Sequence, residues 1–314
     1  MIDFQSPILS DKGWVDDLLH MSVQRACDYN FANLFMWGPL FHARIARMGG
    51  RLAVQVGHPT APAYLWPTGG GDLKEALLAL EADAAEWDRP LRLAAVTEQH
   101  REQLEALFPG QFRYQQTPDE FDYLYEANRL AELTGRKLHA KRNHVNRFLK
   151  ENPGWTYEEL TSGSLPECLA MDRQWYLRTL EREGQGEERE VNDEGLALRR
   201  AAENFSALGL EGGLLRVYGE VVAFTIGSVL SRDTFDVHYE KAYSELQGAY
   251  AMINRCFAGQ VRQKHPEIVY LNRENDMGLE GLRRAKQSYY PDLMVVKYSA
   301  VKTNSGQGGK GRYD

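Results

Sequence analysis

Three apolar runs separated by tight turns dominate the second half of the sequence. They are GLLRVY at 213–218, VVAFTIGSVL at 221–230 and TFDVHYEKA at 234–242. Runs of this length with two- and three-residue connections predict an antiparallel meander of three strands. Because the middle run is apolar at consecutive positions, we expect it to be a central strand covered on both faces.

A helical period follows the meander. From Ala249 to Val261 apolar residues recur every three or four positions, and Ser244 with Gln247 forms a capping-box pattern in front of them. Further strands are expected at 155–160, 268–271 and 293–301, and further helices at 165–180, 193–208 and 278–289. The second half therefore reads β-α-α-β-β-β-α-β-α-β, a mixed α/β order.

The first half repeats this order more faintly. Its clearest element is a hairpin, FHARIARM and RLAVQVG, joined at Gly49–Gly50. A helix precedes it at 11–27, and the expected elements after it are strands at 63–67, 91–96 and 111–115 and helices at 72–87 and 98–108. We therefore expect two mixed α/β domains of one topology: 1–136 and 154–302, with a linker helix at 137–153 and a flexible tail at 303–314. The tail contains G-x-G, but no strand enters it and no helix leaves it, so we do not expect a phosphate loop.

Composition narrows the function. The 44 acidic residues against 37 lysines and arginines argue against general coating of nucleic acid, although a local basic patch remains compatible. Cys27, Cys168 and Cys256 lie far apart without a C-x-x-C pair, which favours free thiols and no metal site. No signal peptide or membrane span is evident, so we expect a cytoplasmic protein. Without a nucleophile elbow, Walker motif or H-E-x-x-H, the sequence favours chemistry done by positioning and electrostatics.

The linker helix carries the densest basic stretch, HAKRNHVNRF at 139–148. At 100° per residue, Lys141 and Arg142 border an apolar stripe, where each could turn into a cleft and bind a phosphate or carboxylate. A second set of side chains lies on the opposite arc, where a solvated helix face is the simpler interpretation. It consists of Arg136, Asn143, Asn146, Arg147 and Lys150.

The segment 270–291, YLNRENDMGLEGLRRAKQSYYP, combines charge with glycine. Gly278 and Gly281 would cost stability in a helix, so they indicate either close packing or a backbone that approaches a ligand. Asp276 could be a helix N-cap. Lys286 lies on the apolar face of the expected helix and needs a partner, which Glu274 or Asp276 could supply.

The third candidate cluster lies on the last strand of the meander. Alternation predicts that Asp236, His238 and Glu240 share one face and that Phe235 and Tyr239 point to the other. The helix that follows would direct its positive N-terminus, near Gly248, toward an anion. Hydrogen bonding on a solvated sheet face, and helix packing for Gly248, are the alternatives.

These three segments resemble the DUF2156 family. The matching stretches are LTGRKLHAKRNHVNRF, VHYEKA with QGAYAMIN, and YLNRENDMGLEGLRRAKQSYYP. The family is related to the C-terminal catalytic domain of phosphatidylglycerol lysyltransferases and, more remotely, to Fem-type peptidyltransferases. The resemblance implies two tandem GNAT-like domains, the acyl-CoA N-acyltransferase fold, and so an acyltransferase.

Carried over to this sequence, the resemblance adds further positions to the candidate site. The catalytic candidates are His238, Glu240, Glu274, Asp276 and Tyr289. The substrate-binding candidates are Lys137, Lys141, Arg142, Asn143, Tyr239, Lys241, Gly248, Asn272, Arg273, Gly278, Gly281, Arg283 and Lys286. In these roles His238 or Glu240 would be the base, Tyr289 or Tyr290 would protonate a leaving group, and Lys141, Arg142, Arg273 and Lys286 would hold phosphate.

The resemblance also indicates the donor and the partners. A coenzyme A-dependent GNAT loop has Gln or Arg, then Gly three residues later, then Gly or Ala two after that; here Glu245, Gly248 and Tyr250 stand there. We therefore expect aminoacyl-tRNA as donor, with acyl-coenzyme A as the alternative, and no tightly bound cofactor. The acceptor would be an amine or hydroxyl of a small molecule, peptide or lipid, and Arg136, Arg147 and Lys150 would meet the tRNA backbone. A non-catalytic module that binds a small anion is the third alternative.

Overall fold

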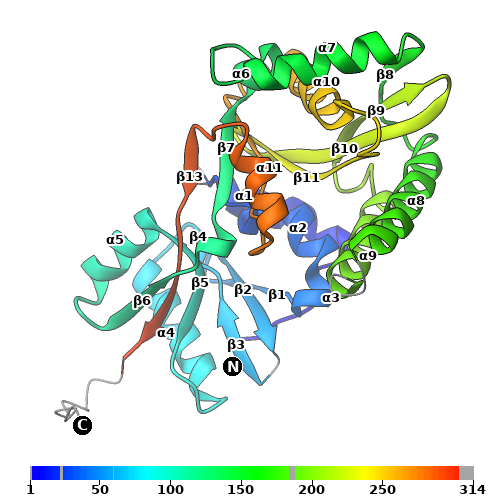
Figure 1. The fold of residues 1–314 in the computed structure, drawn as a ribbon. Coiled ribbons are helices and arrows are strands. Elements are labelled where there is room, and N and C mark those ends of the chain that lie inside the picture. Colours follow the sequence, from blue (N-terminus) through cyan, green and yellow to red (C-terminus); the bar gives the residue numbers. More distant parts are fainter. Residues whose placement is uncertain (1, 22–23, 59, 184–187, 304–314) are drawn as a thin grey trace. The chain divides into compact units, whose positions relative to one another are not determined.

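The computed structural model describes residues 2–21, 24–58, 60–183 and 188–303, and the chain forms two compact units (Figure 1). Unit 1 consists of Met1–Ser22, Gly38–Phe121 and Val295–Asp314, and unit 2 of Val23–Trp37 and Asp122–Met294. This division differs from the expected boundaries at 136 and 153, because each unit takes segments from both halves of the chain. The expected flexible tail at 303–314 lies, apart from Thr303, outside the described residues.

Unit 1 is built on a mixed sheet. The strands run in the order β1-β2-β3-β5-β14-β6, with β4 paired to β2, and only β3 and β5 are parallel. Its described elements are α1 (Lys12–Leu19), α3 (Gly38–Phe41), β1 (Arg44–Met48), β2 (Arg51–His58), β3 (Ala61–Tyr64), β4 (Thr68–Gly69), α4 (Leu73–Ala85), β5 (Arg92–Thr97), α5 (Glu98–Leu107), β6 (Phe112–Gln116) and β14 (Lys297–Lys302), with short 3-10 turns at Leu9–Asp11 and Pro118–Glu120. The hairpin at Gly49–Gly50 is confirmed, and both glycines have the positive φ that its turn requires.

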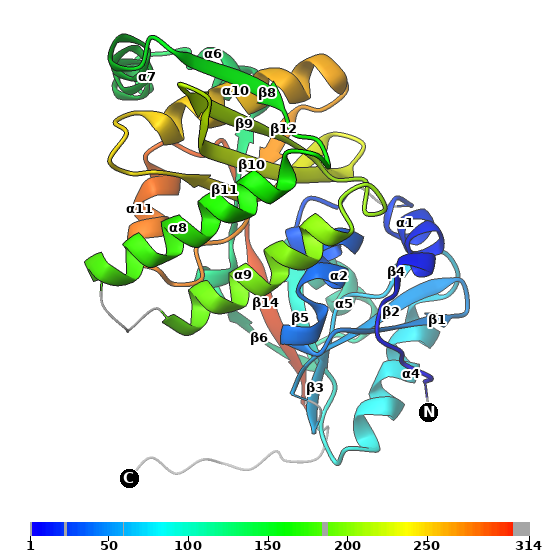
Figure 2. The same cartoon turned by 90° about the vertical axis from the view of Figure 1, so that its right-hand side faces the viewer.

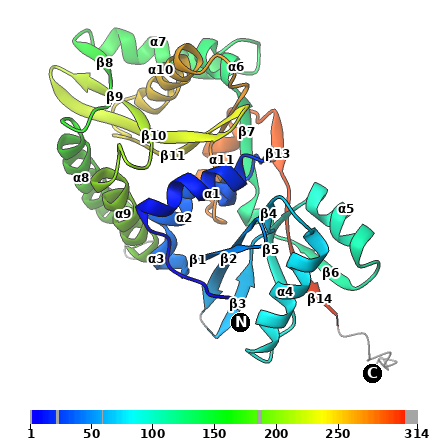
Figure 3. The ribbon, with the colours of Figure 1, turned by 180° about the vertical axis from the view of Figure 1, so that it is seen from behind.

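Unit 2 has a second mixed sheet, of order β13-β7-β12-β11-β10-β9-β8. Its described elements are a 3-10 turn at Cys27–Tyr29, α2 (Phe31–Met36), β7 (Asp122–Glu126), α6 (Ala127–Glu132), α7 (His139–Glu151), β8 (Trp155–Glu159), α8 (Leu165–Glu183), α9 (Glu188–Glu203), β9 (Glu211–Val217), β10 (Glu220–Ser231), β11 (Thr234–Ala242), α10 (Ala249–Lys264), β12 (Tyr270–Asn272), α11 (Glu280–Gln287) and β13 (Leu293–Val295). In Figure 2, α10 lies over one face of this sheet and the α8–α9 pair over the other. Figure 3 shows α6 and α7 beside α10 on its outer side. Within the described ranges no helix combines the length and the apolar character needed to cross a membrane.

The meander is confirmed as β9, β10 and β11, which pair antiparallel. Nearly every residue of β10 is buried, as expected for a central covered strand. Two local predictions are wrong. The N-cap of α10 is Gly248, at φ 88°, and not a residue of the Ser244–Gln247 pair. The apolar run 293–301 is not one strand, because β13 pairs in the sheet of unit 2 and β14 in that of unit 1.

A β-bulge changes the faces of β11. Tyr239 pairs with Ile226 and Val237 with Gly227, so His238 is an extra residue without a partner on β10. Phe235 and Val237 pack in the core around α10, and after the bulge it is Glu240 that contacts α10, through Asn254. The expectation that His238 and Glu240 share a face is therefore wrong, because the bulge reverses the alternation.

Candidate functional site

A cavity of about 640 Å³ lies in unit 2 beside the end of β12. β11 and β12 are parallel and pair only from Thr234 with Tyr270 to Asp236 with Asn272. β12 then ends, while β11 continues to Ala242, so the chain leaves the sheet as a loop at 273–279. The cavity is bounded by this loop, the end of β11, the first turn of α10, and side chains of α7, α8, α9 and α11. Parallel strands commonly place ligand sites at this carboxyl edge.

The cavity brings together many of the residues predicted from the sequence. They are Lys141, His238, Glu240, Lys241, Gly248, Arg273, Glu274, Gly281, Lys286 and Tyr289. The apolar side chains of Met277, Leu279, Leu282 and Ala285 line the cavity as well. One part of the wall is therefore charged and another is apolar.

Arg273 and Glu240 form a buried ion pair at the centre of the charged wall. Arg273 Nη2 donates to Glu240 Oε1 at 2.8 Å, and the two side chains are only 11% and 9% exposed. Asn254 Nδ2 donates to the other oxygen of Glu240 at 3.0 Å. The guanidinium also lies 4.8 Å from the ring centroid of Tyr289. Burial alone would lower the pKa of Arg273, but Glu240 outweighs it and the pKa is raised.

Lys286 holds the backbone of the 273–279 loop. Its ammonium donates to the carbonyl oxygens of Arg273 at 2.5 Å, Glu274 at 3.1 Å and Asn275 at 2.5 Å. An ammonium has three donors, and all three are used. The structure therefore does not fit the predicted contact of Lys286 with a phosphate. Burial lowers the pKa of this lysine to about 8, whereas the Glu274 carboxylate raises it.

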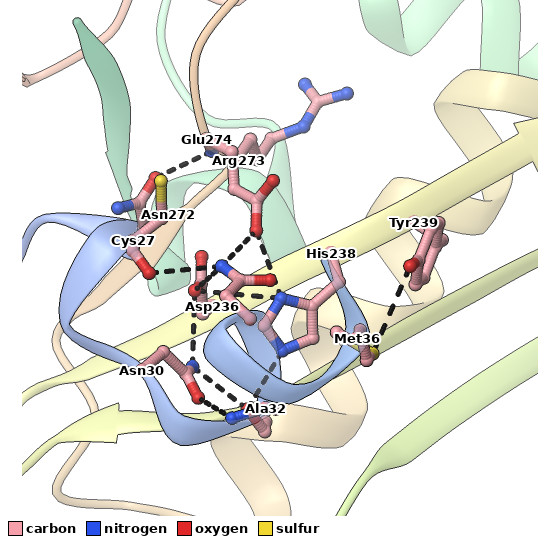
Figure 4. Close-up of polar contacts among 12 residues, drawn as sticks. Cys27, Asn30, Ala32, Met36, Asp236, His238, Tyr239, Asn272, Arg273 and Glu274 are labelled. Atoms are coloured by element: carbon pink, nitrogen blue, oxygen red, sulfur yellow. Dashed lines mark hydrogen bonds and ion pairs between the residues drawn. The ribbon is translucent and has the colours of Figure 1, made fainter. Parts of the chain in front are cut away.

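His238 lies in a polar network that Figure 4 shows in detail. Its Nδ1 is 3.0 Å from Glu274 Oε1 and 3.7 Å from Asp236 Oδ2, and its Nε2 is 2.9 Å from Ser228 Oγ. From the α2 segment, Asn33 Nδ2 donates to Glu274 Oε1 at 2.9 Å and to Asp236 Oδ2 at 3.3 Å. One potential metal-ligand atom from each of Asp236, His238 and Glu274 lies within 4.8 Å of the other two, a spacing that a metal ion could bridge. In the structure these residues are connected by hydrogen bonds, directly between His238 and Glu274 and through the Asn33 amide between Glu274 and Asp236.

Lys241 and Lys141 differ in their partners. Lys241 Nζ is 2.5 Å from Glu194 Oε2 and 3.7 Å from the ring centroid of Trp175. Lys141 Nζ lies 3.9 Å from the ring centroid of Tyr289, and the described residues supply it with no hydrogen-bond acceptor. Burial, and next the positive charge of Arg273, lower the pKa of Lys141 to about 8.

Other predicted residues lie outside the cavity lining. The carboxylate of Asp276 is fully buried and accepts hydrogen bonds from Tyr123 at 2.5 Å and from Arg283 at 2.9 Å. It is not the N-cap of α11, which is Leu279. Arg142 donates to the backbone carbonyls of Leu133 and Gly135 and so closes the connection between α6 and α7.

The remaining predicted residues support or surround the site. Asn272 donates to the Arg25 carbonyl at 2.7 Å and accepts from the Glu274 N–H at 2.6 Å, so it anchors the start of the 273–279 loop. The Tyr239 hydroxyl lies 3.9 Å from the sulfur of Met36 (Figure 4). Lys137, Asn143 and Gly278 are exposed and are not among the lining residues.

Three glycines were singled out in the sequence. Gly278 was expected inside the helix but precedes α11 and has a φ of 78°. Gly248 and Gly281 answer different constraints. A Cβ on Gly248 would overlap the carbonyl oxygen of His144, so this residue permits close packing of α10 on α7. A Cβ on Gly281 would meet nothing within 4 Å. Packing therefore explains Gly248 and does not explain Gly281, which lines the cavity.

Sequence reasoning missed several polar residues that organise the site. Asn33, Ser228, Asn254, Trp175 and Glu194 all contact a predicted residue. Ser228 and Asn254 carry a recognisable signal, since each is a polar side chain within an apolar strand or stripe. Asn33 lies about two hundred residues before its partners, so no local pattern could have paired them.

Comparison with known proteins agrees with this architecture. The family model described as phosphatidylglycerol lysyltransferase, C-terminal, matches residues 21–301. A conserved protein of unknown function from Bacteroides thetaiotaomicron is 37% identical, with a TM-score of 0.89 over 96% of this chain and 100% of that one. The structure of L-PGS from Bacillus licheniformis has a TM-score of 0.64 at 14% identity, over 94% of this chain and 92% of that one.

A curated relative is an uncharacterized protein of Mycoplasmoides gallisepticum, 25% identical over 182 residues. The match spans 56% of this chain and 54% of that protein, so the chain covers about half of the length of that relative. The predicted mixed α/β class is confirmed, with one mixed sheet in each of the two units. The chain belongs to the family described as phosphatidylglycerol lysyltransferase, C-terminal.

Proposed function

We propose that unit 2 is an aminoacyltransferase centre, which moves an aminoacyl group from aminoacyl-tRNA to an amine or hydroxyl acceptor. The observation that carries this proposal is the charged cavity at the end of β12. Its volume of about 640 Å³ suits a small-molecule group, with a charged wall to orient it and an apolar wall to receive a side chain. Membership in a family described by a lysyltransferase supports transfer of an aminoacyl group in particular.

The reaction needs few groups. The acceptor nitrogen or oxygen attacks the donor ester carbonyl and loses a proton. The bond from the carbonyl carbon to the ribose oxygen then breaks, and that oxygen takes up a proton. The oxyanion that forms in between would be stabilised by the positive end of α10, whose residues Gly248 to Ala251 line the cavity. The Arg273–Glu240 pair would hold polar groups of the aminoacyl moiety in place.

The first turn of α10 favours this donor over acyl-coenzyme A. Of the coenzyme A loop pattern only the middle glycine, Gly248, stands at its position. Glu245 stands just before the turn and pairs with Arg178. A carboxylate at this place opposes a pyrophosphate.

The test is a donor comparison with purified protein. Mixed charged tRNAs and acetyl-coenzyme A are offered with pools of amine, peptide and lipid acceptors, and products are identified by mass spectrometry. We expect aminoacylated product from charged tRNA, a large loss in Glu240→Gln, and no change in Glu220→Gln, which alters an exposed side chain at the start of β10. Acetylated product without any tRNA effect would favour the acyl-coenzyme A alternative, and turnover of neither donor would favour a binding module.

A further inference from the structure

Most charged side chains that line the cavity form ion pairs or hydrogen bonds within the protein. Among the described lining residues, Lys141, Lys241, Arg273 and Lys286 are cationic, and Glu194, Glu240 and Glu274 are anionic. Glu194 pairs with Lys241 at 2.5 Å and Glu240 with Arg273 at 2.8 Å. Glu274 pairs with His238 at 3.0 Å, and Lys286 is saturated by three carbonyls. In the part of the chain that the structure describes, Lys141 makes no hydrogen bond or ion pair, and Glu240 acts on it only from a distance. The one other cationic donor of the lining that lacks a partner there is the buried Nη1 of Arg273.

The groups proposed earlier as bases are poorly placed to take a proton. Both ring nitrogens of His238 have partners, Glu274 on one side and Ser228 on the other, and its side chain is fully buried. Both oxygens of Glu240 accept hydrogen bonds, from Arg273 and from Asn254. A base must offer a free lone pair within reach of the substrate.

The surroundings of Lys141 act on its charge in both directions. The Glu240 carboxylate and the face of the Tyr289 ring, 3.9 Å away, favour the ammonium, whereas burial and Arg273 disfavour it. Arg273 faces it from the loop after β12, Glu240 from β11, the Tyr289 ring from the end of α11, and His144 lines the cavity one turn further along α7. Burial and the Arg273 charge act together to lower the pKa of Lys141 to about 8, and Glu240 only partly opposes them. A lysine tuned in this way can exchange a proton near neutral pH.

We propose that Lys141 is the general base of the reaction proposed above. Its neutral amine takes the proton from the attacking amine or hydroxyl of the acceptor as the new bond to the carbonyl carbon forms. The ammonium then returns this proton to the ribose oxygen as the ester bond breaks. Lys141 ends each turnover as a neutral amine. This inference rests on the proposed function, and it replaces the phosphate-holding role that the sequence suggested for Lys141.

Substitution separates the two roles. Arginine keeps the positive charge but cannot give up a proton in a protein. If Lys141 is the base, both Lys141→Arg and Lys141→Met lose transfer by about 10²–10⁴-fold. If Lys141 only holds an anion, Lys141→Arg keeps most of the activity, and this result would overturn the inference. Lys74→Arg, on the exposed start of α4, is the matched control and keeps its rate.

A second readout needs no activity. Trace acetylation of the intact protein with acetic anhydride at pH 6 to 11, followed by peptide mass spectrometry, gives the proton affinity of each amine. We expect Lys141 to titrate near 8, well below the value of about 10.4 of a lysine in a model peptide. Titration of Lys141 with the exposed lysines overturns the inference whatever the activity. Titration near 8 without turnover of any charged tRNA leaves the free amine established and refutes the aminoacyltransferase proposal instead.

The pH profile completes the test. Because only the neutral amine accepts a proton, the transfer rate of the wild-type protein rises as pH increases through about 8. That limb is absent from any residual activity of Lys141→Arg. A limb that persists unchanged in this variant assigns the base to another residue.

Discussion

Both units bury a histidine beside their sheets, and the two side chains have opposite surroundings. In unit 1, His100 stacks on Trp66 at 4.7 Å between ring centroids, accepts the Thr97 N–H, and has its pKa lowered by burial to about 3. In unit 2, His238 has two carboxylates and a serine hydroxyl around its ring. Unit 1 keeps its imidazole neutral through apolar packing. Unit 2 instead arranges opposite charges around a cavity, so its stability and its chemistry depend on the same pairs.

The Arg273–Glu240 pair gives the largest expected effect. Arg273→Met leaves the Glu240 carboxylate buried without its cation, and breaking a buried pair costs about 3–5 kcal/mol of unfolding free energy. Arg273→Met with Glu240→Leu removes both charges and should be less destabilised than the sum of the single variants. Urea unfolding measures the three values. The control is Arg147→Met, which breaks a pair that is about half exposed and should cost no more than about 0.5 kcal/mol.

If the double variant loses as much unfolding free energy as the sum of the two single variants, the proposed coupling of the two charges is contradicted. Such losses would mean that Arg273 and Glu240 contribute separately to the free energy of unfolding. The charged groups of unit 2 would then not stabilise one another.

Lys286 tests whether the 273–279 loop is held by one ammonium. Lys286→Met leaves three carbonyls without their donor, and we expect a loss of about 2–3 kcal/mol of unfolding free energy. Hydrogen exchange should become faster in residues 273–279 in particular. Lys74→Met, which removes an exposed lysine at the start of α4, should change both measurements little. Unchanged exchange in the loop would show that the backbone there is held by other contacts.

His100 provides the test in unit 1. Its pKa is about 3 in the folded chain against about 6.5 for a free imidazole. As pH falls below about 6.5 the unfolded chain binds a proton that the folded chain excludes, so stability decreases by up to about 1.4 kcal/mol per pH unit. We expect a loss of up to about 2 kcal/mol between pH 6.5 and pH 5 that is absent in His100→Gln. Urea unfolding at both pH values measures it, with His58→Gln as an exposed control. An equal loss in His100→Gln would show that other groups carry the pH dependence.

Many elements of the fold and several residues of the site could be predicted from the sequence, and the features that could not have physical reasons. Alternation and helical period located the meander and α10, and charge within apolar segments pointed to Lys141, Glu240 and Lys286. The bulge at His238 was not readable, because one extra residue leaves the apolar pattern nearly unchanged while it reverses the faces beyond it. Pairing over long distances was not readable either. β7 and β14 complete sheets whose other strands lie mostly in the opposite half of the chain.

Gly281 gives the smallest expected change in stability, and it tests whether the open space of the cavity takes part in the reaction. Its missing side chain leaves open space in the cavity, and glycine inside a helix costs about 0.5–1 kcal/mol relative to alanine. Gly281→Ala should therefore raise the unfolding free energy by up to about that amount while it lowers the transfer rate, because the added methyl occupies space that the substrate uses. Gly259→Ala is the matched control: it lies in α10, a Cβ there also meets nothing within 4 Å, and it is not among the lining residues. It should gain similar stability and keep its rate. If both variants keep their rate, the substrate does not occupy the space beside Gly281. Only the charged wall, with Lys141, Glu240 and Arg273, would then contact the substrate.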